Sequence, residues 1–151
     1  MKRTTPIDTI MIHCTATPPR REVSVAELNH WHEAARFEPY VDPKTGIKTY
    51  AGYHLLVHLD GSYERIRPDD QRGQHCPQSN MNNRAVSICY VGGIDNNNKP
   101  CDTRTEAQKR TLLTLVRTMR ARYPKAQIVG HRDYAPKACP SFDAKKEYSA
   151  I

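Results

Sequence analysis

Short apolar segments alternate along this chain with segments of helical periodicity, and no linker interrupts the alternation. Ile7–His13 and Ala85–Val91 are apolar runs rich in β-branched residues, a composition typical of buried strands. Ala126–Gly130 is a shorter run of the same kind. Such runs have to be covered on both faces, so helices from the intervening segments are expected to pack against the sheet that they form.

Two capping-box patterns mark the starts of the predicted helices. Ser24-Val-Ala-Glu27 opens a helix that is predicted to reach about Arg36. Thr105-Glu-Ala-Gln108 opens the longest predicted helix, which extends to about Tyr123 and cannot continue through Pro124. Apolar residues recur on one face of this second helix, which predicts that the face is buried.

A β-hairpin is predicted between the two helices. Tyr53–Leu59 alternates in polarity and is joined to Ser62–Arg67 by Asp60-Gly61, a strong two-residue turn signal. Strands that alternate with helices, together with one hairpin, predict an α/β fold: a single domain with a mixed central β-sheet flanked by helices. Side chains at strand ends are then expected to meet at one rim of the sheet.

The segment from His131 to Asp143 holds the highest density of side chains that could bind a metal or act in catalysis. It holds an imidazole, an ammonium and a thiol, from His131, Lys137 and Cys139, within nine residues, and two prolines stiffen the loop. Imidazole and thiolate are ligands that zinc favours. The competing interpretation, on residue types alone, is a surface loop in which the histidine and the cysteine are unrelated.

A zinc ion bound by this loop needs a further ligand from elsewhere in the chain. His13 is the best candidate, because it ends a predicted strand. Three protein ligands leave a fourth position open, which is the arrangement of catalytic zinc, whereas structural zinc normally has four protein ligands.

Four motifs of the chain resemble the zinc amidase family, which includes phage N-acetylmuramoyl-L-alanine amidases and the peptidoglycan recognition proteins. They occur in the family's order and are His13-Cys-Thr-Ala-Thr, Gly52-Tyr53-His54, Val91-Gly92-Gly93-Ile94-Asp95 and Ala135-Pro-Lys-Ala-Cys-Pro-Ser-Phe-Asp143. The likeness runs from about residue 7 to residue 143. It implies that residues 1–151 form one zinc amidase domain.

The resemblance also implies a function and a set of site residues. The zinc ligands would be His13, His131 and Cys139, with one Zn²⁺ per chain, and the catalytic side chains would be Tyr53 and Lys137. The reaction would be hydrolysis of the amide between the lactyl group of N-acetylmuramic acid and L-alanine in peptidoglycan. Zinc would activate the attacking water and polarise the carbonyl, while the two catalytic side chains stabilise the developing oxyanion.

Several other residues are candidates for the site or lie beside the implied ligands. His75 lies where the family lines its substrate cleft, and we predict a substrate-binding role for it, with a purely structural role as the alternative. The other histidines, and Cys14 beside His13, are predicted to be packed or solvated. Lys137 stands two residues from Cys139, so its charge is expected to favour the thiolate. Residues 37–51 read as an inserted loop that departs from the family pattern and borders the substrate groove.

Two other functional classes compete with the amidase. One is a non-catalytic peptidoglycan-recognition module, but binding-only members of the family typically lack the cysteine ligand, and Cys139 is present. The other is a nucleic-acid-binding domain driven by the net charge of +7. The basic residues are scattered and no recognition motif is found, so we expect no nucleic-acid partner.

The composition and the N-terminal residues indicate where in the cell the protein is expected to be made and to act. No run approaches the ~20 apolar residues that would cross a bilayer, and the basic N-terminus lacks an apolar signal region, so neither membrane insertion nor a secretory signal is expected. The odd number of cysteines, five, argues for reduced thiols. We therefore expect a monomeric endolysin of phage or prophage type, made in the cytoplasm and acting on the wall after its release. Export by a dedicated machine is the alternative.

Overall fold

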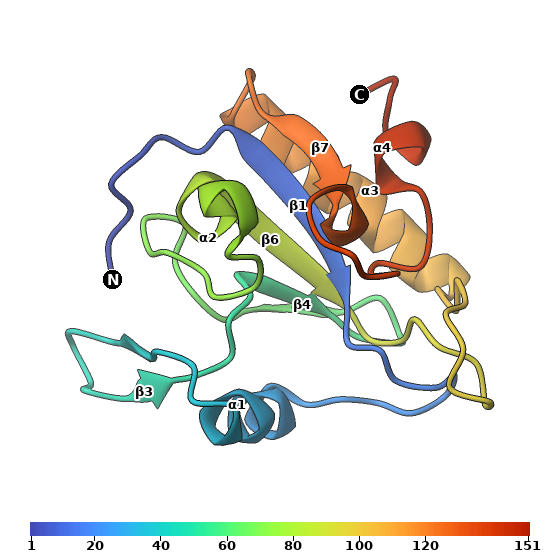
Figure 1. Ribbon diagram of the computed structural model, residues 1–151, viewed down its shortest axis with the longest axis horizontal. Coiled ribbons are helices and arrows are strands. Elements are labelled where there is room, and N and C mark those ends of the chain that lie inside the picture. The colour runs from blue at the N-terminus through green and yellow to red at the C-terminus, as the bar shows by residue number, and fades with distance from the viewer.

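A five-stranded mixed sheet forms the centre of the computed structural model, which describes residues 1–151 (Figure 1). The strand order is β5-β4-β6-β1-β7. Strands β4, β6, β1 and β7 run parallel, and β5 pairs antiparallel with β4 at one edge. The strands are β1 (Thr9–Cys14), β4 (Leu55–Val57), β5 (Tyr63–Arg65), β6 (Ala85–Tyr90) and β7 (Gln127–Gly130). The predicted mixed sheet is thus confirmed.

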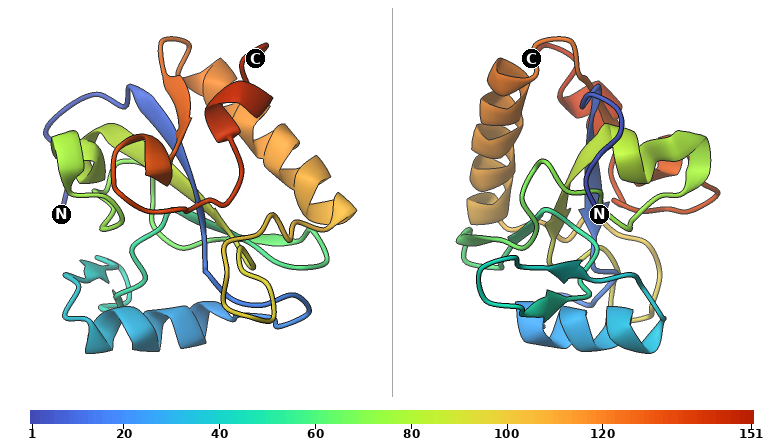
Figure 2. Two further views of the ribbon diagram at one scale, coloured as in Figure 1. Left: turned by 45° about the vertical axis from the view of Figure 1, so that its right-hand side comes forward. Right: turned by 90° about the vertical axis from the view of Figure 1, so that its left-hand side faces the viewer.

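Helices cover both faces of this sheet (Figure 2). The longest, α3, lies along one face, while α1 and α2 pack on the other. The helices are α1 (Val25–Ala34), α2 (Met81–Arg84), α3 (Glu106–Arg122) and α4 (Ala144–Glu147), with 3₁₀ turns η1 (Gln78–Asn80) and η2 (His131–Asp133). None of the helices combines the length and the apolar character needed to cross a bilayer.

Strand β1 lies between β6 and β7, and all six of its residues are buried. Side chains alternate along a strand, so Ile10 and Ile12 enter the core that packs against α3. Met11 lies on the opposite face, in the cluster that includes Met81 of α2. The alternation places His13 on the α1 and α2 side of the sheet, away from the long helix.

The two predicted capping boxes are formed to different extents. In α3, the Thr105 hydroxyl accepts the Gln108 backbone N–H, and the Gln108 side chain accepts the Thr105 N–H, which completes the box. In α1, Ser24 accepts the backbone N–H of Glu27, but the Glu27 carboxylate pairs with Arg21 instead of returning to the helix start. This helix therefore has a single cap bond.

Residues 37–51 are not the plain loop that the sequence predicted. They contain a small antiparallel hairpin, β2 (Tyr40–Val41) with β3 (Lys48–Thr49). The buried guanidinium of Arg67 donates hydrogen bonds to the carbonyl oxygens of Glu38 and Ala51 at the two ends of this segment. One side chain from the end of the β4–β5 hairpin thereby fixes the base of the insertion.

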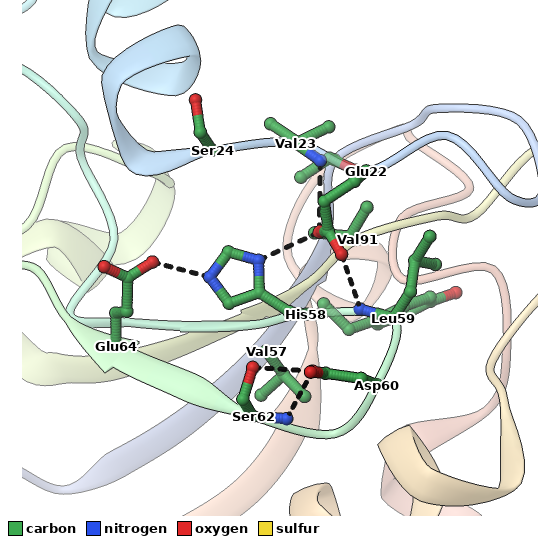
Figure 3. A network of polar contacts seen from close by, with 12 residues as sticks. Glu22, Val23, Ser24, Val57, His58, Leu59, Asp60, Ser62, Glu64 and Val91 are labelled. Carbon is green, nitrogen blue, oxygen red and sulfur yellow. Dashed lines mark hydrogen bonds and ion pairs between the residues drawn. The ribbon is translucent and has the colours of Figure 1, made fainter.

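The predicted Asp60-Gly61 turn joins β4 to β5, and His58 stands beside it between two carboxylates (Figure 3). The Nδ1 atom of His58 lies 2.9 Å from Glu22 Oε1, and its Nε2 lies 2.6 Å from Glu64 Oε2. Burial alone would lower the pKa of His58, but the two carboxylate hydrogen bonds outweigh burial and raise it. The imidazolium thus ties the segment before α1 to the hairpin.

This tie predicts a pH-dependent contribution to stability. A histidine with a raised folded-state pKa stabilises the fold fully below its unfolded value of 6.5, and loses the contribution as pH rises through the folded value. At about pH 5.5, His58→Gln should lower the free energy of unfolding by about 0.5–1 kcal/mol, as expected for partly exposed ion pairs. Urea denaturation with a chelator present, at about pH 5.5 and about pH 9, measures the difference.

The exposed His30 supplies the matched control, since His30→Gln should leave unfolding unchanged at both pH values. If His58→Gln lowers the free energy of unfolding equally at the two pH values, the charged pairing of His58 with Glu22 and Glu64 is contradicted.

Candidate metal centre

Two histidines meet at the carboxyl edge of the sheet because their strands are parallel neighbours. In the β1–β7 pairing Ile12 stands opposite Gly130, so the residues that follow, His13 and His131, are adjacent. Their ring centroids are 4.6 Å apart. Cys139 reaches the same point from the loop after η2, and the ligand atoms of the three residues all lie within 4.8 Å of one another. The structure thus brings together the three predicted ligands.

The spacing of these atoms fits zinc. Zinc bonds of about 2.1 Å to nitrogen and about 2.3 Å to sulfur, at a tetrahedral angle, place the two donor atoms about 3.6 Å apart. Cys139 Sγ lies 3.7 Å from His13 Nδ1. Two imidazoles and a thiol form a donor set that suits zinc and leaves a fourth position open.

Close packing beneath the loop holds Cys139 in place. A Cβ atom on Gly130 would lie 2.7 Å from the Pro140 ring, so the loop approaches β7 only because residue 130 is glycine. The Arg132 N–H donates to the Cys139 carbonyl at 2.7 Å, and the Tyr90 hydroxyl donates to the Pro140 carbonyl at 2.6 Å. Both bonds fix the backbone directly after the Cα that carries the thiol.

The far end of the same loop is anchored in the core. Phe142 is buried, and the Arg104 guanidinium carbon lies 3.4 Å from the centroid of its ring. The charge of Arg104 is balanced by Asp102 and Glu147, at 2.9 and 2.6 Å. This arrangement connects α4 to the start of α3 and limits the freedom of the cysteine loop.

Both histidines of the centre are neutral near pH 7. Burial lowers the pKa of His13 well below its usual value, and neighbouring His75, His131 and Lys137 add to the effect. Burial, followed by Lys137, lowers the pKa of His131 to about 4. Neutral rings offer the lone pair that a metal requires.

The charge of Lys137, which was expected to favour the thiolate, does not set the pKa of Cys139 in the metal-free protein. A hydrogen bond with the Cys14 thiol, and then burial, raise the pKa of Cys139. The Cys14 side chain is buried with the core, as predicted, but it also contacts Cys139, and its backbone N–H donates to the Cys139 sulfur at 3.2 Å. The residue with the largest effect on the pKa of Cys139 is therefore not its neighbour in the sequence. A metal that binds to Cys139 must displace the proton of the thiol.

The two predicted catalytic side chains adjoin the cluster. The ring of Tyr53 is 5.0 Å from the His13 ring, and burial, with a smaller effect from the thiol of Cys89, raises the pKa of its phenol well above the usual value. Tyr53 is thus a hydroxyl donor at neutral pH. Lys137 is exposed, and its ammonium is near enough to lower the pKa of both histidines.

His75 is buried and does not lie on the surface of the protein. It is 9% exposed, and its Nδ1 is 2.9 Å from the Nε2 of His13. The sequence predicted a role for His75 at the site but not this contact with a candidate ligand. His32 was also missed: its Nδ1 accepts the Gly52 N–H at 2.9 Å, which positions the backbone before Tyr53.

The remaining histidines lie away from the three donors. His54 is buried and is bonded to Ser87 and to the Gln71 carbonyl, whereas His58 forms the surface clasp with two glutamates. His30 is exposed on α1. All three have the packed or solvated environments that were predicted for them.

Comparison with known proteins gives the family. Residues 3–142 match the family described as N-acetylmuramoyl-L-alanine amidase. The endolysin of Escherichia phage T7 is 37% identical over 139 residues, which are 92% of this chain and 83% of that protein. The endolysin of Klebsiella phage KP32 is 36% identical over 137 residues, or 91% and 82% of the two chains.

Solved structures share the fold. The Ph2119 endolysin from a Thermus scotoductus bacteriophage superposes with a TM-score of 0.70 at 25% identity, over 93% of this chain and 80% of that one. Drosophila PGRP-LB gives 0.72 at 18% identity, over 99% and 84%; at that identity the likeness concerns the fold alone. From the family match and the identity to the phage proteins, we conclude that this chain belongs to the N-acetylmuramoyl-L-alanine amidase family.

Proposed function

We propose that this amidase is zinc-dependent and that it hydrolyses the bond between the lactyl group of N-acetylmuramic acid and L-alanine in bacterial peptidoglycan. One observation supports the zinc requirement above all others. Two neutral imidazoles and a thiol, from His13, His131 and Cys139, converge at the carboxyl edge of the sheet with the spacing of zinc ligands. A bound zinc would supply Lewis-acid polarisation of the scissile carbonyl and activation of water.

The charges of the ligand set suit this chemistry. Two neutral imidazoles and one thiolate leave a divalent cation with a net positive charge, which favours electrophilic catalysis. Burial keeps His13 and His131 neutral, so neither has to lose a proton before it binds a metal. Cys139 is the ligand whose proton is exchanged for the metal.

Tyr53 and Lys137 are the proposed catalytic residues. The high pKa of Tyr53 keeps its hydroxyl protonated, so it can donate a hydrogen bond to a carbonyl oxygen that gains charge. The ammonium of Lys137 is exposed and near enough to His13 and His131 to lower their pKa values, so it would bring a positive charge to the substrate at this centre. Together they would stabilise the tetrahedral oxyanion and position the water.

The non-catalytic recognition module is the second candidate. It would share the fold, but it would not need a thiol held beside two buried neutral imidazoles. A binding surface gains nothing from burying three such donors together, because buried polar groups carry a desolvation cost. Cys139 therefore favours hydrolysis.

We extend the endolysin role of the phage relatives to this chain. A monomer that lyses the wall from within would act once the membrane has been opened. The net charge of +7 would promote its association with the polyanionic wall.

Metal content provides the first test. The purified protein should contain about one zinc per chain, and Cys139→Ser should lose most of it, because a hydroxyl is a far poorer zinc ligand than a thiolate at neutral pH. His131→Ala should do the same. Atomic absorption after dialysis measures the content, with Cys101→Ser and His30→Ala, both at exposed positions, as matched controls. Full occupancy in both ligand variants would reject the site.

Catalysis can be separated from metal binding in a second test. Tyr53→Phe and Lys137→Ala should retain zinc and the fold but lose about 10²–10³-fold in turnover, which is the usual cost of one oxyanion-stabilising donor. Lysis of membrane-permeabilised bacteria gives the rate, and intact cells should resist. Tyr63→Phe, at a tyrosine that is 54% exposed, is the control. Parent rates for both variants would remove the catalytic assignment.

A further inference from the structure

The two ring nitrogens of His13 face different partners. Nδ1 lies 3.7 Å from Cys139 Sγ, on the side where the three candidate ligands meet. Nε2 lies 2.9 Å from Nδ1 of His75, in a contact buried on both sides. Since the first nitrogen faces the metal position, the second is free to form a hydrogen bond.

A neutral imidazole carries one proton, and the nitrogen that binds a metal cannot be the one that holds it. A metal on Nδ1 therefore requires the proton of His13 to be on Nε2. His75 Nδ1 must then be the acceptor, and the proton of its own ring is on Nε2. Histidines that bind metals are usually oriented by such a partner, most often a carboxylate or a backbone carbonyl.

We propose that His75 is the positioning residue of the metal centre, accepting the Nε2–H of His13 and so fixing the tautomer and the ring orientation that turn Nδ1 toward Cys139. The proposal rests on the proposed zinc function. It replaces direct substrate binding as the main role of His75, because the ring is 9% exposed and its Nδ1 is used by His13.

The surroundings of His75 hold it in this position. Its backbone N–H donates to Asn82 Oδ1 at 2.6 Å, and the preceding Gln74 N–H donates to the Gly52 carbonyl at 2.9 Å. Gly73 leaves room for the ring, since an added Cβ would collide with it. The position of the ring is therefore set by backbone contacts that do not involve the ligand residues.

A neutral partner has a chemical consequence. A carboxylate would make the ligand more basic and add a negative charge near the metal, whereas His75 orients His13 without that charge. The Nε2 of His75 is buried and has no hydrogen-bond partner, so no acidic group of the protein continues the chain. The arrangement orients the ligand and leaves the positive charge of the metal largely intact.

Three substitutions at this position separate the proposal from general packing. An asparagine side chain ends near the position of the imidazole Nδ1, so His75→Asn retains an acceptor for His13. In His75→Gln the polar end lies near Nε2 instead, and His75→Ala has no polar group. Zinc affinity, measured by competition with a chromophoric chelator, should fall about 10–100-fold in the glutamine and alanine variants. The asparagine variant should bind zinc close to the parent level.

Thermal unfolding of the metal-free proteins shows whether each variant folds. Parent zinc affinity in folded His75→Ala and His75→Gln would overturn the proposal, whether or not the KM for peptidoglycan rises. Equal losses of affinity in all three variants would also overturn it, because packing alone would then be responsible.

Nitrogen NMR of the His13 ring in the parent protein tests the tautomer without any substitution. A proton on Nε2, before and after addition of zinc, is the expected result, and a proton on Nδ1 would overturn the proposal. A parent protein that binds no zinc would reject the proposed function. A parent protein that binds zinc but carries the His13 proton on Nδ1 would reject only this inference.

Discussion

Parallel pairing of β1 with β7 sets Ile12 opposite Gly130, and this register determines where the two histidines of the centre stand. A shift by one residue would turn His13 to the face covered by α3, where Ile10 and Ile12 pack. Burial of all six β1 residues makes such a shift very unfavourable. The same apolar strand thus contributes side chains to the core and fixes the position of His13 in the site.

Burial also sets the protonation of the centre. It lowers the pKa values of His13 and His131, so both rings are available as ligands without a competing proton. It raises the pKa of Cys139, with the hydrogen bond from Cys14 as the larger cause. Under the proposed function, two of the ligands would be ready to bind and Cys139 would be protonated, so binding of zinc would release a proton.

Much of the fold could be predicted because its signals are local. The strand runs, the Asp60-Gly61 turn and the two helix starts all depend on residues within one segment. His13, His131 and Cys139 could be proposed from residue type, position at strand ends and resemblance to a family. The parallel pairing of β1 and β7 then brings His13 and His131 together, and the loop after β7 adds Cys139.

Contacts between distant segments could not be predicted in the same way. His13 and His75 are separated by 62 positions, and their hydrogen bond depends on how the 73–75 segment packs against residue 52. Lys137 is two positions from Cys139, yet Cys14, far earlier in the chain, has the larger effect on the thiol. The β2–β3 hairpin was missed because its two-residue strands are too short to give a periodic signal.

The bond that this protein cleaves can be identified by mass spectrometry of purified peptidoglycan after digestion by the zinc-loaded protein. We expect free stem peptides with a new L-alanine amino terminus, and glycan strands whose N-acetylmuramic acid keeps its lactyl carboxylate. Chelator should abolish both products. New sugar reducing ends, cleavage within the peptide, or bound but undigested wall would contradict the assignment of this centre as a zinc amidase.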